Sequence, residues 1–83
     1  MDFRVYVIVE LPILDKKYEL LVPIDRRIHD LITVLKKAIP ELTSDFYEKR
    51  EPVLMSKTSG DVYDMNAVIK NTNIKNGTRV ILI

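Results

Sequence analysis

Phe3-Arg-Val-Tyr-Val-Ile-Val-Glu-Leu11 is followed, one short connection later, by Lys17-Tyr-Glu-Leu-Leu-Val22. In the first stretch every odd-numbered residue is apolar and Arg4 and Glu10 occupy even positions, which is typical of a half-buried strand. The second stretch predicts another strand, and the brief connection over 12–16 makes the pair an antiparallel hairpin. The side chains of the second strand that we expect to point inward are Tyr18, Leu20 and Val22.

An amphipathic helix is predicted after the hairpin, because apolar residues recur there at spacings of three and four. They are Ile28, Leu31, Ile32, Leu35 and Ile39. The expected N-cap of this helix is Asp25, with a start one or two residues later as the alternative. Lys36 and Lys37 lie in the expected last turn, where the helix dipole favours cations. Pro40 ends the helix, because the residue before a proline resists helical geometry.

The second half of the chain predicts shorter elements. Residues 40–52 form a long polar connection between two prolines. Val-Leu-Met at 53–55 predicts a short third strand, and Val-Tyr at 62–63 predicts a very short fourth one. The residues Thr-Ser-Gly-Asp at 58–61 predict the turn between them.

The chain closes on a tight turn and a final strand. Ile69 and Ile74 are apolar positions in the connecting segment, and we expect both to be buried anchors. Asn76-Gly77 is a strong turn signal. It leads into Arg-Val-Ile-Leu-Ile at 79–83, which predicts the last strand.

The order strand, strand, helix, strand, short strand, strand indicates an α+β fold of the β-grasp type. A helix after a hairpin must cover one sheet face, and the first and last strands, being the most apolar, belong at the sheet centre. We therefore expect residues 1–83 to form one domain, with a mixed sheet of four to five strands packed on one helix. The expected core consists of Val5, Val7, Val9, Leu20, Ile28, Leu31, Ile32, Leu35, Ile39, Val53, Met55, Ile69, Ile74, Val80 and Leu82.

The segment Ile69-Lys-Asn-Thr-Asn-Ile74-Lys-Asn-Gly-Thr-Arg-Val80-Ile-Leu82 resembles the closing pattern of ubiquitin. That pattern has an apolar residue, an isoleucine five positions later, a tight turn and an alternating last strand. Tyr18-Glu-Leu20 and Ile28-His-Asp-Leu31-Ile32 are similar to the YukD/EsaB family, small ubiquitin-like proteins associated with bacterial type VII secretion. The resemblance covers nearly the whole chain. It implies a cytoplasmic accessory or regulatory protein whose partners are proteins, secretion-system components among them.

Composition argues against several other classes. The chain has 83 residues and a net charge of +1, with both signs well mixed, whereas a dedicated nucleic-acid binder usually carries a basic face. It has no cysteine, which removes disulfides and thiolate metal sites. No apolar stretch has the ~18 residues that a membrane span needs. The start of the sequence lacks the basic region of a signal peptide, so we expect a soluble, cytoplasmic protein.

No motif predicts catalysis, a metal site or a cofactor. His29 is the only histidine, and it adjoins Asp30 at a spacing that points two helical side chains in different directions. The serines have no base at a spacing that would make a nucleophile. Gly60 and Gly77 fall in no phosphate-loop pattern and are expected in turns.

A ubiquitin-like modifier or a sulfur carrier is the alternative function for this fold. Both need a flexible Gly-Gly tail, because only glycine lets a backbone thread the channel of an activating enzyme. The sequence ends at Ile83, inside the predicted last strand. On that ground we expect an interaction module rather than a modifier, with nucleic-acid binding through the helix as a third hypothesis.

The helix-free face of the sheet is the expected working surface. Strand side chains alternate, so if Val5 and Val7 point at the helix, their neighbours point away from it. The same argument applied to the other strands gathers apolar residues on one face. Contiguous exposed apolar patches often mark contact sites. We expect this patch to bind a protein partner or a second copy of the chain in a weak homodimer. Its residues are Tyr6, Ile8, Leu54, Ile81 and Ile83.

Overall fold

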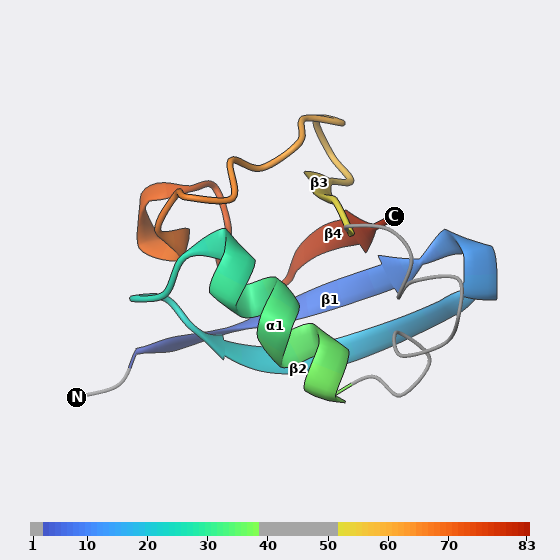
Figure 1. The fold of residues 1–83 in the computed structure, drawn as a ribbon, viewed down its shortest axis with the longest axis horizontal. Coiled ribbons are helices and arrows are strands. Elements are labelled where there is room, and N and C mark those ends of the chain that lie inside the picture. The colour runs from blue at the N-terminus through green and yellow to red at the C-terminus, as the bar shows by residue number, and fades with distance from the viewer. Residues whose placement is uncertain (1–2, 39–51) are drawn as a thin grey trace.

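A computed structural model describes residues 3–38 and 52–83, and it shows one sheet packed on one helix, α1 (Ile28–Ala38) (Figure 1). The strand order is β2-β1-β4-β3, with β1 and β4 parallel at the centre and the outer pairs antiparallel. The most apolar strands therefore lie at the sheet centre, as expected. The strands are β1 (Arg4–Leu11), β2 (Lys16–Pro23), β3 (Leu54–Ser56) and β4 (Thr78–Leu82).

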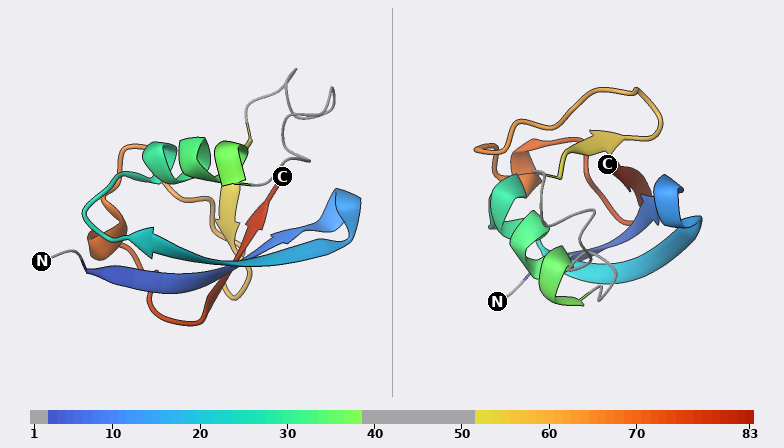
Figure 2. Two further views of the ribbon diagram at one scale, coloured as in Figure 1. Left: turned by 90° about the horizontal axis from the view of Figure 1, so that it is seen from below. Right: turned by 45° about the vertical axis from the view of Figure 1, so that its right-hand side comes forward.

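The hairpin of β1 and β2 is confirmed. Its connection is a single turn of 3-10 helix, η1 (Pro12–Leu14), which Asp15 ends in the left-handed conformation with φ at 51°. The register sets Val9 opposite Tyr18, so side chains that face each other across the pair share a face. Both strands consequently turn one apolar side toward α1, which the left view of Figure 2 shows lying across the sheet.

Helix α1 takes the later of the two expected starts, and Asp25 is not its N-cap. The helix starts at Ile28, whose backbone N–H donates to the carbonyl of Ala67 at 2.9 Å; the N–H of His29 donates to Met65 at 3.0 Å. A loop distant in sequence thus satisfies donors that a helix leaves open at its start. Asp30 adds one bond by accepting from the N–H of Arg27 at 3.3 Å.

The core lies between α1 and the sheet and confirms most of the predicted list. Val5 and Leu20 are only half-buried and pack against its edge, and Ile39 lies outside the described residues, as does most of the 40–52 connection. Three fully buried residues were missing from the expected core, namely Leu11, Val22 and Leu54. The residues predicted and found buried are Val7, Val9, Ile28, Leu31, Ile32, Leu35, Ile69, Ile74, Val80 and Leu82.

Strand β3 presents the opposite side chains from those expected. Leu54 is 0% exposed and belongs to the core, whereas Val53 and Met55 are half-buried on the other face. The pairing with β4 is the cause, because it sets Leu54 opposite Leu82, a buried residue. A shift of one residue in register reverses every side chain of a strand, and the expected assignment was wrong by that one step.

Residues 57–77 carry the chain from β3 back to β4 without another strand. Val62 forms one isolated bridge to Met55, so the very short strand expected at 62–63 is not formed. A turn of 3-10 helix, η3 (Ile69–Asn71), places Ile69 in the core. Gly77, with φ at 85°, then makes the tight turn that the sequence predicts.

Candidate docking face of the sheet

One face of the sheet points away from α1, and we call it the open face. No helix or second sheet covers it among the described residues (Figure 2). On β1 it carries Tyr6 and Ile8, since Val7 and Val9 are buried beneath the helix. The parallel register sets Ile81 beside Glu10, and β3 sets Met55 beside Ile81 on the other side. The open face thus extends across three strands at the level of Ile81.

An apolar patch lies on this face and is formed by half-buried side chains. We define it by its residues, which are Tyr6, Ile8, Met55, Ile81 and Ile83. Leu21 extends the apolar surface onto β2, where it lies opposite Tyr6 and is 66% exposed. Four of the five patch residues come from the central strands β1 and β4 or directly follow β4. Rigid strands therefore fix the relative positions of these side chains.

Leu54 does not belong to this patch, and Met55 takes its place. Val-Leu-Met is apolar at all three positions, so alternation alone does not indicate which of these side chains face the helix. Backbone hydrogen bonds determine which side chains face the helix, because Val53 and Ile83 exchange two N–H to carbonyl hydrogen bonds of 2.7 and 2.9 Å. Ser56, buried at 2% exposure, would have misled any assignment that places the polar residue outward.

Polar groups frame the patch on two sides. The Tyr6 hydroxyl donates to Glu19 at 3.4 Å, and Glu10 forms an ion pair of 2.7 Å with Lys57. The hydrogen bond from Lys57 lowers the pKa of the Glu10 carboxyl, with weaker help from the positive charges of Lys17 and other residues, and partial burial opposes this shift. The carboxylate is therefore held charged beside Ile81, where it limits the apolar surface.

The turn at Asn76 and Gly77 braces the start of the patch. The backbone N–H of Tyr6 donates to Asn76 Oδ1 at 2.9 Å, and the N–H of Gly77 donates to the Tyr6 carbonyl at 2.8 Å. These bonds join β1 to the segment just before β4 begins. The sequence identified the turn, but nothing in its pattern indicated that the Asn76 side chain would bind β1.

The described residues assemble no metal-binding cluster. His29 and Asp30 approach within 3.5 Å on the solvent side of α1, on the opposite side of the sheet from the patch. No group of three or more His, Cys, Asp or Glu side chains able to hold a metal occurs within residues 3–38 and 52–83. None of the helices described there is long and apolar enough to cross a bilayer.

Comparison with known proteins finds similarity in structure alone. No family model matches the sequence, and no curated protein matches it. Caldiarchaeum subterraneum ubiquitin superposes with a TM-score of 0.74 at 16% identity, over 98% of this chain and 92% of that one. An Arabidopsis thaliana ubiquitin-like domain superposes with a TM-score of 0.69 at 18% identity, over 96% and 76% of the two chains.

A third solved structure was described under the words "Molecular Mimicry of SUMO promotes DNA repair". It superposes with a TM-score of 0.77 at 15% identity, over 96% of this chain and 90% of that one. Identities this low carry information on the fold and not on the role. With the strand order and the single helix, these likenesses show that the chain has the ubiquitin-like β-grasp fold.

Proposed function

We propose that this chain is a non-catalytic protein-interaction module that docks a partner protein on the apolar patch of the open face. The patch itself is the observation that carries the proposal. Five apolar side chains from three strand regions share a face that no helix or strand of the described chain covers, with Arg79 beside Ile8 and Glu10 beside Ile81. Removing apolar surface of this kind from water is favourable, and a partner that covers the patch gains this free energy on binding.

We further propose that the partner is a component of a bacterial type VII secretion system in the cytoplasm. The support is the resemblance of Tyr18-Glu-Leu20 and Ile28-His-Asp-Leu31-Ile32 to the YukD/EsaB family. In this role residues 1–83 act as one accessory or regulatory domain, with no metal, cofactor or reaction of their own.

A charge-neutral variant tests the docking surface. We define the face variant as Met55→Gln combined with Ile81→Thr, which makes two patch side chains polar without unpairing the strands. The control is Val34→Thr, because Val34 is an apolar residue on the solvent side of α1 and is 46% exposed. Binding is measured by calorimetry against the purified cytosolic domains of a type VII secretion ATPase.

The face variant is expected to lose more than about tenfold in affinity while the control binds as the wild type does. Equal binding by all three proteins would show that the patch is not the interface. If the wild type binds no secretion component, the secretion role is wrong. Sedimentation of the wild type and the face variant then shows whether the patch joins two copies of the chain instead.

A further inference from the structure

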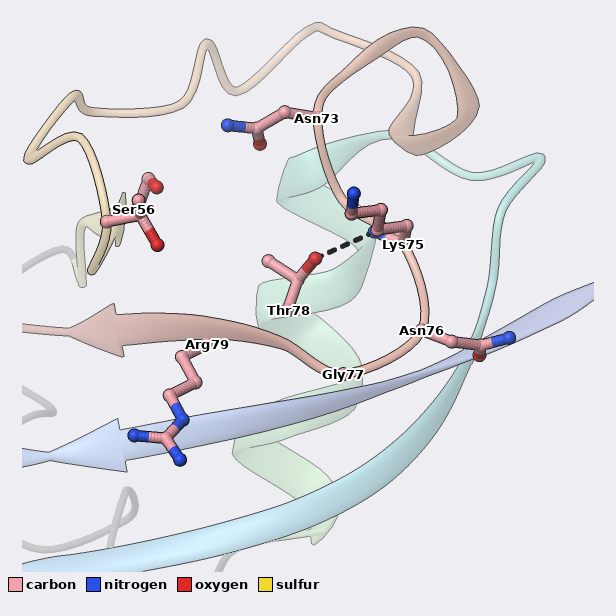
Figure 3. Close-up of a pocket in the computed structure, with 8 residues that line it drawn as sticks. Ser56, Asn73, Lys75, Asn76, Gly77, Thr78 and Arg79 are labelled. Carbon is pink, nitrogen blue, oxygen red and sulfur yellow. Dashed lines mark hydrogen bonds between the residues drawn. The ribbon is translucent and has the colours of Figure 1, made fainter.

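A cavity of about 490 Å³ opens at the start of β4, between that strand and the turn after β3 (Figure 3). It exists because β3 ends at Ser56, opposite Val80, so that Thr78 and Arg79 have no strand on their outer side. The chain instead turns back, and the N–H of Gly60 donates to the Ser56 carbonyl at 2.8 Å. Its lining residues are Ser56, Thr58, Asn73, Lys75, Asn76, Gly77, Thr78 and Arg79.

The walls of the cavity are fixed by hydrogen bonds. The N–H of Lys75 donates to Thr78 Oγ1 at 2.9 Å. The Tyr63 hydroxyl donates to Asn73 Oδ1 at 2.7 Å, which leaves the amide nitrogen of Asn73 as a donor; Figure 3 shows that nitrogen on the side facing Ser56. The cavity thus offers side-chain donors that are already oriented.

The lining carries two positive charges and no negative one. Neither Lys75 nor Arg79 forms an ion pair with any residue that the structure describes. Glu10, on the adjoining open face, forms its ion pair with Lys57 at 2.7 Å, and the charge of Arg79 is the weakest of the influences that lower the pKa of that carboxyl. The charge of the lining is therefore available to an anionic ligand.

The cavity is also continuous with the apolar patch. Arg79 lines the cavity and, by the parallel register, lies beside Ile8 on the open face. A partner seated on the patch would therefore lie next to the cavity and could extend an adjoining segment into it.

We propose that this cavity receives an acidic segment, with two or more Asp or Glu carboxylates, from the protein that docks on the patch. The proposal rests on the proposed function and names the chemistry of its partner. Thr78 and Arg79 project to opposite sides of β4, as Figure 3 shows, so Arg79 can bind one carboxylate through two parallel N–H bonds at the open-face edge of the cavity. Lys75 attracts another carboxylate within it as a point charge. The Asn73 amide nitrogen and the hydroxyl of Thr58 add neutral donors.

A phosphate fits this cavity less well than carboxylates do. Phosphate sites usually converge several backbone N–H groups on one anion. Here the N–H groups of Lys75, Thr78 and Gly77 are bonded to Thr78 Oγ1, Lys75 and Tyr6 respectively. These three N–H groups therefore cannot converge on one phosphate, and the positive side chains of Lys75 and Arg79 lie on different parts of the lining, which suits several spaced carboxylates.

The test is a nuclear magnetic resonance titration of the full chain with an acetylated, amidated hexaglutamate peptide. We expect amide shifts at 56–58 and 73–79 that weaken as salt is raised. Lys75→Glu with Arg79→Glu should lower the affinity roughly tenfold, since each exposed charge pair contributes a modest amount. Lys36→Glu with Lys37→Glu, the same change of charge on α1, should leave it unchanged. Thermal melting checks that both variants fold.

Equal losses in the two charge variants, or shifts elsewhere on the molecule, would overturn the inference. So would tighter binding of inorganic phosphate or a single-stranded oligonucleotide through the same residues. The face variant separates this inference from the proposed function, because it should bind hexaglutamate normally while losing the partner. A wild type that binds its partner but not the peptide contradicts the acidic segment alone.

Discussion

At the end of β4 and in β3 the two faces of the sheet are built from equally apolar residues, yet one face is buried and the other is not. On β4 the run Val80-Ile-Leu-Ile83 alternates between them: Val80 and Leu82 are fully buried under α1, while Ile81 and Ile83 are half-buried on the open face. On β3 the same division separates Leu54 from Met55. Hydrophobicity does not distinguish these neighbours, and only the side on which the helix lies does. Substitutions on the two faces should therefore have opposite consequences for stability and for docking.

The largest expected effect comes from the buried side of β3. Leu54→Ala should lower the free energy of unfolding by about 2–5 kcal/mol, because it removes side-chain atoms from a fully buried site and leaves a cavity. Leu35→Ala, at the facing helix, should cost about as much. Met55→Ala, one residue away on the open face, should cost less than about 1 kcal/mol. Urea unfolding measures all three. Similar losses at positions 54 and 55 would contradict the register of β3.

The turn that sets β4 in register should give the next largest effect. Gly77→Ala is expected to cost about 1 kcal/mol, because φ at 85° is unfavourable for a residue with a Cβ. No atom lies within 4 Å of the added Cβ, so the cost comes from the backbone conformation alone. Gly77→Asn should lose less, since asparagine tolerates this region better. If alanine and asparagine are equally harmful in thermal melts, a steric explanation replaces this one.

The open face should tolerate charge where the buried face does not. Ile81→Lys is expected to change stability by less than about 1 kcal/mol, because a long side chain on this face can keep its ammonium in water. The same substitution should abolish partner binding. Leu54→Asp added to it would unfold the protein, since it buries an unpaired carboxylate. Circular dichroism and binding measured on the single variant separate the two effects; loss of structure in Ile81→Lys would place that residue in the core.

The smallest expected effect concerns how the free energy of unfolding decreases at acidic pH. The folded state holds the pKa of Glu10 below its unfolded value of about 4.3 through Lys57. A lowered folded pKa contributes stability above the unfolded pKa, and this contribution is lost as the pH falls through the folded pKa. Glu10→Gln should therefore flatten the decline in urea midpoint below about pH 4.3. The difference should shrink in 1 M salt, roughly the condition where exposed pairs are screened. If Glu10→Gln and the wild type lose stability equally as the pH falls, the ion pair does not contribute to stability.

Local patterns in the sequence determined the hairpin, the helix stripe and the closing turn. In each case residues close in the chain interact, so alternation in 3–11 and the three–four spacing from Ile28 predict the buried side without knowledge of distant partners. Tyr6, Ile8 and Ile81 were placed on the helix-free side in this way, and the structure has them there. Their role in docking stays a prediction.

Only the tertiary structure decided the features that depend on distant segments. Val-Leu-Met at 53–55 has no internal alternation, and pairing with β4 alone chose Leu54 for the core. The start of α1 depends on the carbonyls of Met65 and Ala67, and a local N-cap signal at Asp25 contains no information about these distant residues. The cavity beside Arg79 exists because β3 ends opposite Val80 and does not extend along the first two residues of β4. Strand length and register are set by hydrogen bonds between residues that are far apart in the sequence. The same amino-acid sequence fits either of two registers that differ by one residue, and that difference exchanges the two faces of the strand.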